Sequence, residues 1–187
     1  MKIFFCLLSA FCLSRPLIAG GVCERSEPVV FALSQDLGKK CDDIQPADLA
    51  KVTELRLPHI HINAFMDNDF VGLTNLRKLV MRSLFHNWGF PTDPISINEN
   101  VFAGLSSLEE LHINTDQLGL LPDGVFSGLT GLKYLNLMGT SLSRLPASLL
   151  TLPKIEELRC RDQGLGLSPV DFSKLKAALG SKLKMTR

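Results

Sequence analysis

Hydrophobic residues recur at a fixed spacing in the second half of the chain. Residues 108–131 are LEELHINTDQLGLLPDGVFSGLTG, and residues 132–154 are LKYLNLMGTSLSRLPASLLTLPK. The pattern LxxLxLxxxxLxxL is therefore written twice, 24 positions apart. A fixed period of this length is typical of a repeat architecture, in which each unit buries its apolar face only against its neighbours. Within each unit, the LxL portion predicts a short strand whose leucines point inward.

The same pattern extends to both sides of this pair. Repeat starts at positions 52, 76, 108, 132 and 155 give intervals of 24, 32, 24 and 23 residues. One interval is eight residues too long, and the extra residues lie within 84–97. Strands of successive repeats are expected to pair in parallel, because each is followed by a return segment that brings the chain back to the same edge. Residues 52–168 are thus predicted to form one array of repeats.

The second half of the unit carries a family resemblance. Pro122, Gly124, Phe126, Gly128 and Leu129 give LPxGxFxGL after the leucine pattern, which resembles leucine-rich repeats of the typical extracellular kind. The resemblance implies an α/β fold: a short curved solenoid of about five repeats, with a parallel sheet on its concave face. It also implies an Asn in the turn after each strand, and the sequence departs from this with Ile60, Leu84, Asp116, Thr140 and Gln163.

The segments before and after the repeats are expected to cap the open ends of the stack. Residues 22–51 contain a predicted helix from Pro28 to Gly38, with Val30, Leu33 and Leu37 on one face, and a second short helix ending at Leu49. This segment resembles, more weakly, the caps of secreted bacterial leucine-rich repeat proteins. Residues 169–187 predict a C-terminal cap helix, with Val170, Phe172, Leu175, Leu179 and Leu183 at helical spacing. A helix lying on a membrane surface is the alternative.

The first 21 residues, MKIFFCLLSAFCLSRPLIAGG, have the features of a signal peptide. An early Lys precedes an apolar run that is too short to span a bilayer, and small residues follow it. Cleavage is expected near Ala19 or Gly21, which predicts a secreted or periplasmic protein. An uncleaved anchor is the alternative, and Val22 before Cys23 departs from the pattern of a lipid-acceptor cysteine.

Three cysteines remain after the predicted signal peptide. In an oxidising compartment Cys23 and Cys41 would form a disulfide. Cys160 falls at an inward strand position and is expected to be a buried small hydrophobe, with a reactive thiol as the alternative.

Composition argues against some partners. The chain has 20 basic and 19 acidic residues; without Lys2 and Arg15 it has 18 and 19, a net charge of −1. A near-neutral chain has no large basic field, so nucleic acid and anionic membranes are not expected partners.

The first candidate binding surface is the concave face of the predicted sheet. Its solvent-facing strand positions are Glu54, Arg56 and Pro58; Lys78, Val80 and Arg82; Glu110, His112 and Asn114; Tyr134, Asn136 and Met138; Glu157, Arg159 and Arg161. An aromatic ring and a thioether beside an imidazole and an amide give contact area that interfaces favour. The candidate binding residues are therefore His112, Tyr134, Asn136, Met138, Arg82, Arg159 and Arg161. An ordinary solvated surface is the alternative.

The second candidate is the insertion, where Phe85, His86, Trp88 and Phe90 fall within six residues. An aromatic loop on a rigid scaffold is a common place for recognition. Packing of these aromatics on the flank of the solenoid is the alternative.

Catalysis is not expected. The sequence contains no Gly-x-Ser-x-Gly motif and no phosphate-binding glycine loop. His59 and His61 are two positions apart but lack a third metal ligand at a recognisable spacing, and no cofactor or metal is predicted. We therefore predict a non-catalytic exported module that binds a protein or peptide. A structural or self-associating envelope protein is the second hypothesis, and an enzyme or metal-dependent sensor using His59, His61 or His86 is the third.

Overall fold

The structure is a computed structural model that describes residues 21–57, 64–82, 96–115, 118, 120–140, 142–144, 146–161 and 168–186. The predicted signal peptide and its cleavage site, the aromatic residues of the insertion, and His59 and His61 lie outside the described residues.

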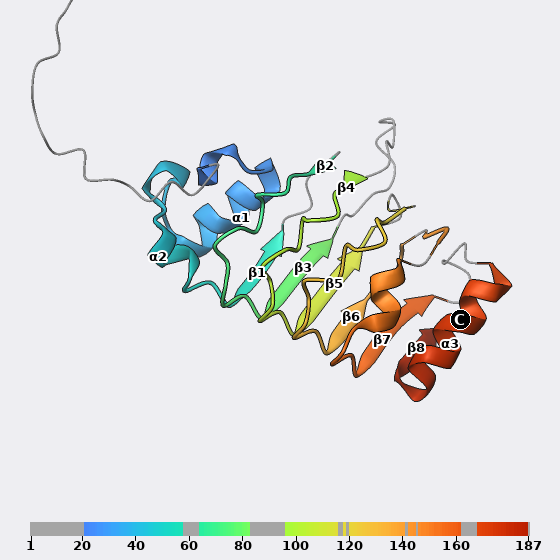
Figure 1. The fold of residues 1–187 in the computed structure, drawn as a ribbon. Coiled ribbons are helices and arrows are strands. Elements are labelled where there is room, and N and C mark those ends of the chain that lie inside the picture. The colour runs from blue at the N-terminus through green and yellow to red at the C-terminus, as the bar shows by residue number, and fades with distance from the viewer. Residues whose placement is uncertain are drawn as a thin grey trace, which may run out of the picture.

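A six-stranded parallel sheet organises the molecule (Figure 1). Its strand order follows the chain, and its members are β1 (Glu54–Leu57), β3 (Lys78–Arg82), β5 (Glu110–Asn114), β6 (Tyr134–Asn136), β7 (Glu157–Arg161) and β8 (Leu183–Thr186). Two short strands, β2 (Ala64–Phe65) and β4 (Ser96–Ile97), pair in parallel as a second sheet. The predicted fold class, an α/β repeat solenoid with a parallel sheet, is confirmed.

The register of the large sheet stacks one leucine of each repeat on the next. The partners across the strands are Leu55, Leu79, Leu111, Leu135, Leu158 and Leu183. The first five are buried and the last is half-buried, so this row forms the floor of the core beneath the sheet. Met81 and Ile113 add a second inward row, and Cys160 is fully buried as predicted.

One solvent-facing position was predicted wrongly. Val80 is only 4% exposed, although alternation along β3 assigned it to the outer face. Its partners on the neighbouring strands are Arg56 and His112. Long polar side chains lay their apolar portions over small neighbours, which accounts for the burial of a valine between two such residues.

The other side of the core is built from phenylalanines. Phe65, Phe70, Phe102 and Phe126 form a ladder of stacked rings with centroids 6.0–6.3 Å apart. Phe70, Phe102 and Phe126 are essentially unexposed. Aromatic rings bury large apolar areas and favour offset stacking at this distance, so ring stacking joins the return segments in addition to the short β2–β4 pairing.

Short helices close the N-terminal end. The 3-10 helix η1 (Val22–Glu24) leads into α1 (Glu27–Leu37), and η2 (Cys41–Asp43) leads into α2 (Pro46–Leu49). Gly38 ends α1 with φ 61°, a conformation that glycine adopts without strain. Helix α1 lies against β1 (Figure 1). Its buried face is Pro28, Val29, Ala32 and Leu33, whereas Val30 and Leu37, which were predicted to share a face with Leu33, are both half-buried.

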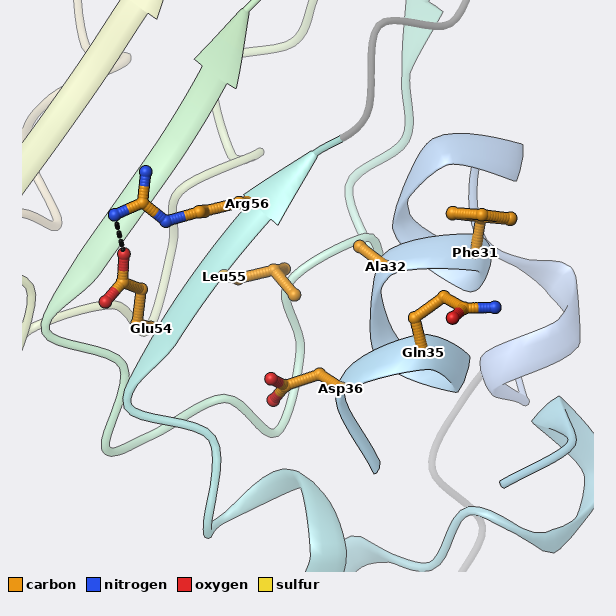
Figure 2. A pocket seen from close by; sticks show the side chains of 7 residues that line it. All are labelled: Phe31, Ala32, Gln35, Asp36, Glu54, Leu55 and Arg56. Carbon is orange, nitrogen blue, oxygen red and sulfur yellow. Dashed lines mark ion pairs between the residues drawn. The ribbon is translucent and has the colours of Figure 1, made fainter. Parts of the chain in front are cut away.

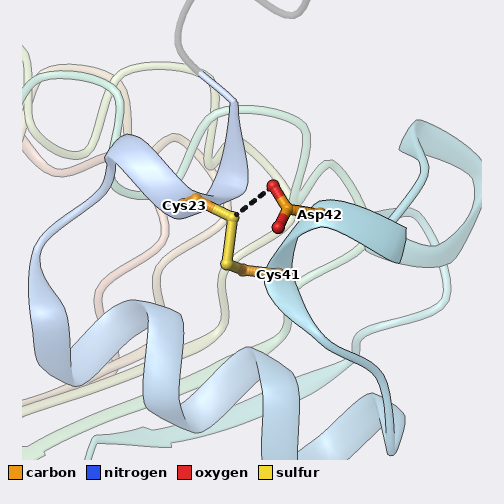
Figure 3. Close-up of a disulfide and its surroundings, with 3 residues drawn as sticks. All are labelled: Cys23, Cys41 and Asp42. Carbon is orange, nitrogen blue, oxygen red and sulfur yellow. Dashed lines mark hydrogen bonds between the residues drawn. A yellow bond between two sulfur atoms is a disulfide. The ribbon is translucent and has the colours of Figure 1, made fainter.

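A disulfide and a buried polar cluster fasten this end. Cys23 and Cys41 form the predicted disulfide (Figure 3). Asp69 is fully buried and accepts hydrogen bonds from the Ser26 backbone N–H (2.6 Å), the Ser26 hydroxyl (2.6 Å) and the Met66 N–H (2.8 Å). The Arg25 guanidinium donates to the carbonyls of Asp69 and Val71. Burial lowers the pKa of Arg25, and the Asp69 charge opposes that shift.

The C-terminal end differs from the single helix predicted over 169–187. Helix α3 covers Pro169–Leu179 and is followed by η4 (Gly180–Lys182) and strand β8, which pairs with β7. Gly180 has φ 52°, which interrupts the helix. Leu175 and Leu179 are buried, whereas Val170 is 62% exposed. Leu183 therefore belongs to the sheet rather than to the helix face.

The turn after β6 shows how a residue other than Asn serves there. Thr140 is buried, and its hydroxyl donates to the Leu137 carbonyl at 2.8 Å. The other four residues at this repeat position lie outside the described residues. Among the helices that the structure describes, none has both the length and the apolar content needed to cross a membrane.

Candidate binding surface on the concave face

The outward side chains of the large sheet stand in rows set by the register. One row contains Glu54, Lys78, Glu110, Tyr134 and Glu157. The next contains Arg56, Val80, His112, Asn136, Arg159 and Lys184. Neighbouring strands are about 4.8 Å apart, so side chains in one row contact each other directly and those in adjacent rows meet diagonally.

Tyr134 is the centre of an aromatic and cationic cluster on β5, β6 and β7. The His112 ring lies 5.1 Å from the Tyr134 ring, centroid to centroid, at an interplanar angle of 39°. On the other side, the Arg159 Cζ lies 5.3 Å from the Tyr134 centroid, within the range of a cation–π interaction. We call His112, Tyr134 and Arg159 the Tyr134 cluster. Its tyrosine is held on both sides and presents a fixed surface to solvent.

Neighbouring carboxylates hold the outer members of the Tyr134 cluster. Glu157 pairs with Arg159 along β7. Glu110 accepts from Lys78 Nζ at 2.6 Å, and its carboxylate lies 3.4 Å from His112 Nε2. Such exposed pairs contribute little stability individually, so their consequence here is positional: they fix where the imidazole and the guanidinium point.

The charges of the cluster follow from its surroundings. Partial burial lowers the pKa of His112, against an opposing effect of the hydrogen bond to Glu110. The hydrogen bond from Lys78 lowers the pKa of Glu110. The hydrogen bond that Arg159 Nε–H donates to the Glu157 carboxylate raises the pKa of Arg159. At neutral pH the surface therefore combines a neutral imidazole and a phenol with a guanidinium.

The structure gathers four of the predicted concave residues and places the others at its margin. His112, Tyr134, Asn136 and Arg159 are neighbours in the register. Asn136 accepts a hydrogen bond from the Met138 backbone N–H at 2.9 Å, which places Met138 in the turn beyond β6. Arg82 is the register partner of Asn114, farther along the strands. Arg161 ends β7, and its side chain lies outside the described part of the chain.

A close approach at the margin requires glycine. Gly139 has φ 82°, and a Cβ atom built on it would lie 2.6 Å from Asn114 Oδ1. The left-handed backbone of this turn favours glycine, and a side chain at residue 139 would also displace the exposed Asn114 side chain at the end of β5.

Two carboxylates were not among the candidate binding residues. Glu110 and Glu157 were assigned only to solvent-facing strand positions, and each contacts a member of the Tyr134 cluster. The signal that identifies them is their place two residues before His112 and Arg159, since residues i and i+2 of a strand share one face.

One group of potential metal ligands occurs among the described residues. Cys23 Sγ, Cys41 Sγ and an Asp42 oxygen lie within 4.8 Å of one another, with Asp42 Oδ1 3.1 Å from Cys23 Sγ (Figure 3). Both sulfurs belong to the disulfide, and metal binding by cysteine requires thiolates. This group therefore does not make a metal centre while the disulfide is intact.

Comparisons with known proteins agree with this architecture. A family model described as "Leucine rich repeat" matches residues 106–161. The structure is similar to TLR13 in its complex with ssRNA13, with 24% identity and a TM-score of 0.53, over 78% of this chain and 19% of that one. It is also similar to internalin C2 of Listeria monocytogenes, with 16% identity and a TM-score of 0.37, over 86% of this chain and 93% of that one. No curated protein sequence matches the chain.

The chain thus spans less than a fifth of the length of TLR13, and that likeness concerns the fold alone. The family match covers the repeats that build β5, β6 and β7, the strands that carry the Tyr134 cluster. The family match and the regular leucine register together identify residues 106–161 as leucine-rich repeats, and β1 and β3 continue the same parallel sheet and register.

Proposed function

We propose that this protein binds a protein or peptide partner through the concave face, with the Tyr134 cluster as the central contact. The observation that carries the proposal is the arrangement of Tyr134 between His112 and Arg159. Tyrosine and arginine are the residue types that dominate the binding energy of protein interfaces. Leucine-rich repeats are in general protein-binding scaffolds, and this cluster lies at the middle of the sheet rather than at an edge.

The rigidity of the cluster supports binding rather than a passive surface. Each polar member has a neighbour within the sheet that limits its rotamers before a partner arrives. Binding then loses less side-chain entropy than it would on a surface of freely rotating side chains. The sequence features of a signal peptide support an exported protein, so the proposed partner is extracellular or periplasmic.

The charges on the concave face are of both signs. Lys78 with Glu110, Arg56 with Glu54, and Arg159 with Glu157 form ion pairs on it. A nucleic acid contributes one phosphate per nucleotide and needs an excess of cations, whereas a polypeptide tolerates paired charges. These pairs therefore support a polypeptide partner.

The experiment is an affinity capture from envelope and extracellular extract with the purified chain as bait. Tyr134→Ala is the test variant, and Lys176→Ala, an exposed residue of α3, is the matched control. We expect the native and control baits to retain one partner, and the Tyr134→Ala bait to bind it at least about tenfold more weakly, because hot-spot tyrosines contribute about 2 kcal/mol or more. Circular dichroism confirms that each bait is folded.

Two outcomes change the proposal. Equal capture by Tyr134→Ala would show that the concave face is not the binding surface. In that case the predicted insertion loop becomes the candidate, with Trp88→Ala as its variant. Capture of nothing but further copies of the bait would instead favour self-association. One observation favours that second function: β8 is the last strand in the sheet, with a strand neighbour on one side only among the described residues.

A further inference from the structure

A recess lies at the N-terminal margin of the sheet, between helix α1 and strand β1 (Figure 2). It has a volume of about 480 Å³, and its lining residues are Phe31, Ala32, Gln35, Asp36, Glu54, Leu55 and Arg56. Ligand pockets in proteins are commonly about 300–1,000 Å³, so it accommodates a long side chain together with the adjoining peptide unit. We call it the α1–β1 pocket. None of its α1 residues was predicted to take part in binding.

The pocket has an apolar floor and one aromatic wall. Leu55 and Ala32 are buried at its base, at 1% and 6% exposure. Phe31 is 48% exposed, one of the few large hydrophobic side chains of the described residues left in solvent. An exposed aromatic ring beside a recess is costly unless it serves a contact, and its π face attracts planar cations.

The electrostatics of the pocket favour a positive charge. Asp36 points from the last turn of α1 toward β1 (Figure 2), and within the described part of the chain its carboxylate has no hydrogen-bond or ion-pair partner. An acidic residue there lies beside the negative end of the helix dipole, which destabilises the helix slightly. Glu54 is paired with Arg56 at 2.6 Å. The lining therefore carries one uncompensated negative charge, and a bound cation would compensate both that charge and the helix end.

We propose that the α1–β1 pocket binds an arginine side chain of a polypeptide partner. The guanidinium pairs with the Asp36 carboxylate, and its flat face stacks on Phe31, while its methylene groups lie over Leu55. Arginine fits better than lysine because its planar fork matches a carboxylate and also stacks on an aromatic face. The pocket opens beside the outward row that leads from Arg56 to His112. It thus adds a specificity contact to the concave face, and only the source of the arginine rests on the proposed function.

The test uses short peptides and does not need the natural partner. The probes are acetyl-Gly-Arg-Gly-amide, the same peptide with citrulline, which is neutral and nearly isosteric, and the same peptide with lysine. Binding is followed by the NMR shifts of the Leu55 and Ala32 methyl groups in the purified protein. We expect saturable shifts with the arginine peptide and at least about fivefold weaker binding of the citrulline peptide, which loses the ion pair and the cation–π contact. The lysine peptide should also bind more weakly, because an ammonium group lacks the planar fork that pairs with a carboxylate and stacks on a ring.

Two variants should change the affinity for the arginine peptide in opposite directions. Asp36→Asn should weaken the arginine peptide about three- to fivefold by removing the ion pair. Arg56→Gln should strengthen it by about twofold or more, because it releases Glu54 and removes a like charge. Asp43→Asn, an exposed acid outside the lining, is the matched control and should change nothing.

Three results would overturn the inference: no shift at Leu55 and Ala32 with any probe, equal binding of the arginine and citrulline peptides, or equal binding of the arginine and lysine peptides. Each is independent of the affinity capture. Failure of Tyr134→Ala to affect a natural partner leaves the peptide result standing, and the absence of peptide binding leaves the Tyr134 cluster standing.

Discussion

The two ends of the sheet are closed by different chemistry. At the N-terminal end, α1 lies against β1 and is fastened by a disulfide and by the fully buried Asp69. At the C-terminal end, β8 extends the sheet by one strand, and α3 contributes the apolar residues Leu175 and Leu179. Removing one partner from a buried hydrogen-bonded cluster lowers the free energy of unfolding sharply, because the other partner is left buried and unpaired. Shortening an apolar side chain lowers it in proportion to the volume deleted. The N-terminal end should therefore fail abruptly and the C-terminal end gradually.

Asp69→Ala is expected to have the largest effect. The substitution leaves the buried N–H of Ser26 without an acceptor, takes the acceptor from the Met66 N–H and removes the charge opposite Arg25. We expect the free energy of unfolding to fall by about 3–5 kcal/mol, measured by urea denaturation. The exposed Asp67→Ala, two residues away, is the control and should change it by less than about 0.5 kcal/mol. A loss below about 1 kcal/mol for Asp69→Ala would show that the buried cluster does not fasten the cap.

Loss of the disulfide should rank next. Cys23→Ser with Cys41→Ser removes a cross-link between residues 18 positions apart, which costs about 3 kcal/mol in the loop-entropy account. Hydrogen exchange should accelerate in α1 and α2 and stay slow in β6 and β7, because repeats interact mainly with their neighbours. Added reductant should accelerate hydrogen exchange in the native protein and leave the exchange rates of the double variant unchanged. Equal acceleration throughout the sheet would mean that the ends are not independent.

Leu179→Ala should have a smaller effect at the other end. Leucine-to-alanine changes in cores cost about 2–5 kcal/mol, and we expect the lower part of that range, because the last helix can settle into the space left. Exchange should accelerate first in β8 and α3. Lys176→Ala, one of the exposed residues of the same helix, is the control. If β1 exchanges as early as β8, the proposed gradual opening from the C-terminal end is wrong.

The smallest effect is a pH dependence at Asp48. The hydrogen bond from Lys39, with those from the Gln45 N–H and Lys51, holds the pKa of Asp48 well below its usual value. A lowered folded-state pKa stabilises the fold above the ordinary aspartate pKa of about 4, and this contribution is lost as the pH falls below it. The stability difference between the native protein and Asp48→Asn should therefore be largest near neutral pH and shrink toward pH 2.5. Asp43→Asn, at an exposed acid of the same cap, is the control for the loss of one charge.

The repeat could be predicted from the sequence, but the side-chain contacts between repeats could not. Leucine spacing predicted which residues of β1, β3, β5, β6 and β7 point inward, because strand alternation is a local property. Val80 was the exception, since its burial depends on side chains from the two adjacent strands. Asp69 was passed over for the same reason: its partners Arg25 and Ser26 lie more than 40 positions away.

The C-terminal cap shows where local periodicity misleads. Leu183 continues the helical spacing of Leu175 and Leu179, but the turn at Gly180 ends the helix and the chain pairs with β7 instead. Pairing with a distant strand leaves no periodic trace in four residues. The candidate surface was predicted in part: strand alternation placed His112, Tyr134 and Arg159 on one face, while their mutual contacts depend on the register between repeats.

The phenylalanine ladder also sets the direction in which the sheet curves. Rings of successive repeats, Phe70, Phe102 and Phe126, are 6.0 and 6.3 Å apart, whereas paired strands are only about 4.8 Å apart. The wider spacing on the ring side makes that side convex and the strand side concave. The Tyr134 cluster thus faces the inner side of the bend, where a surface that fits it is convex.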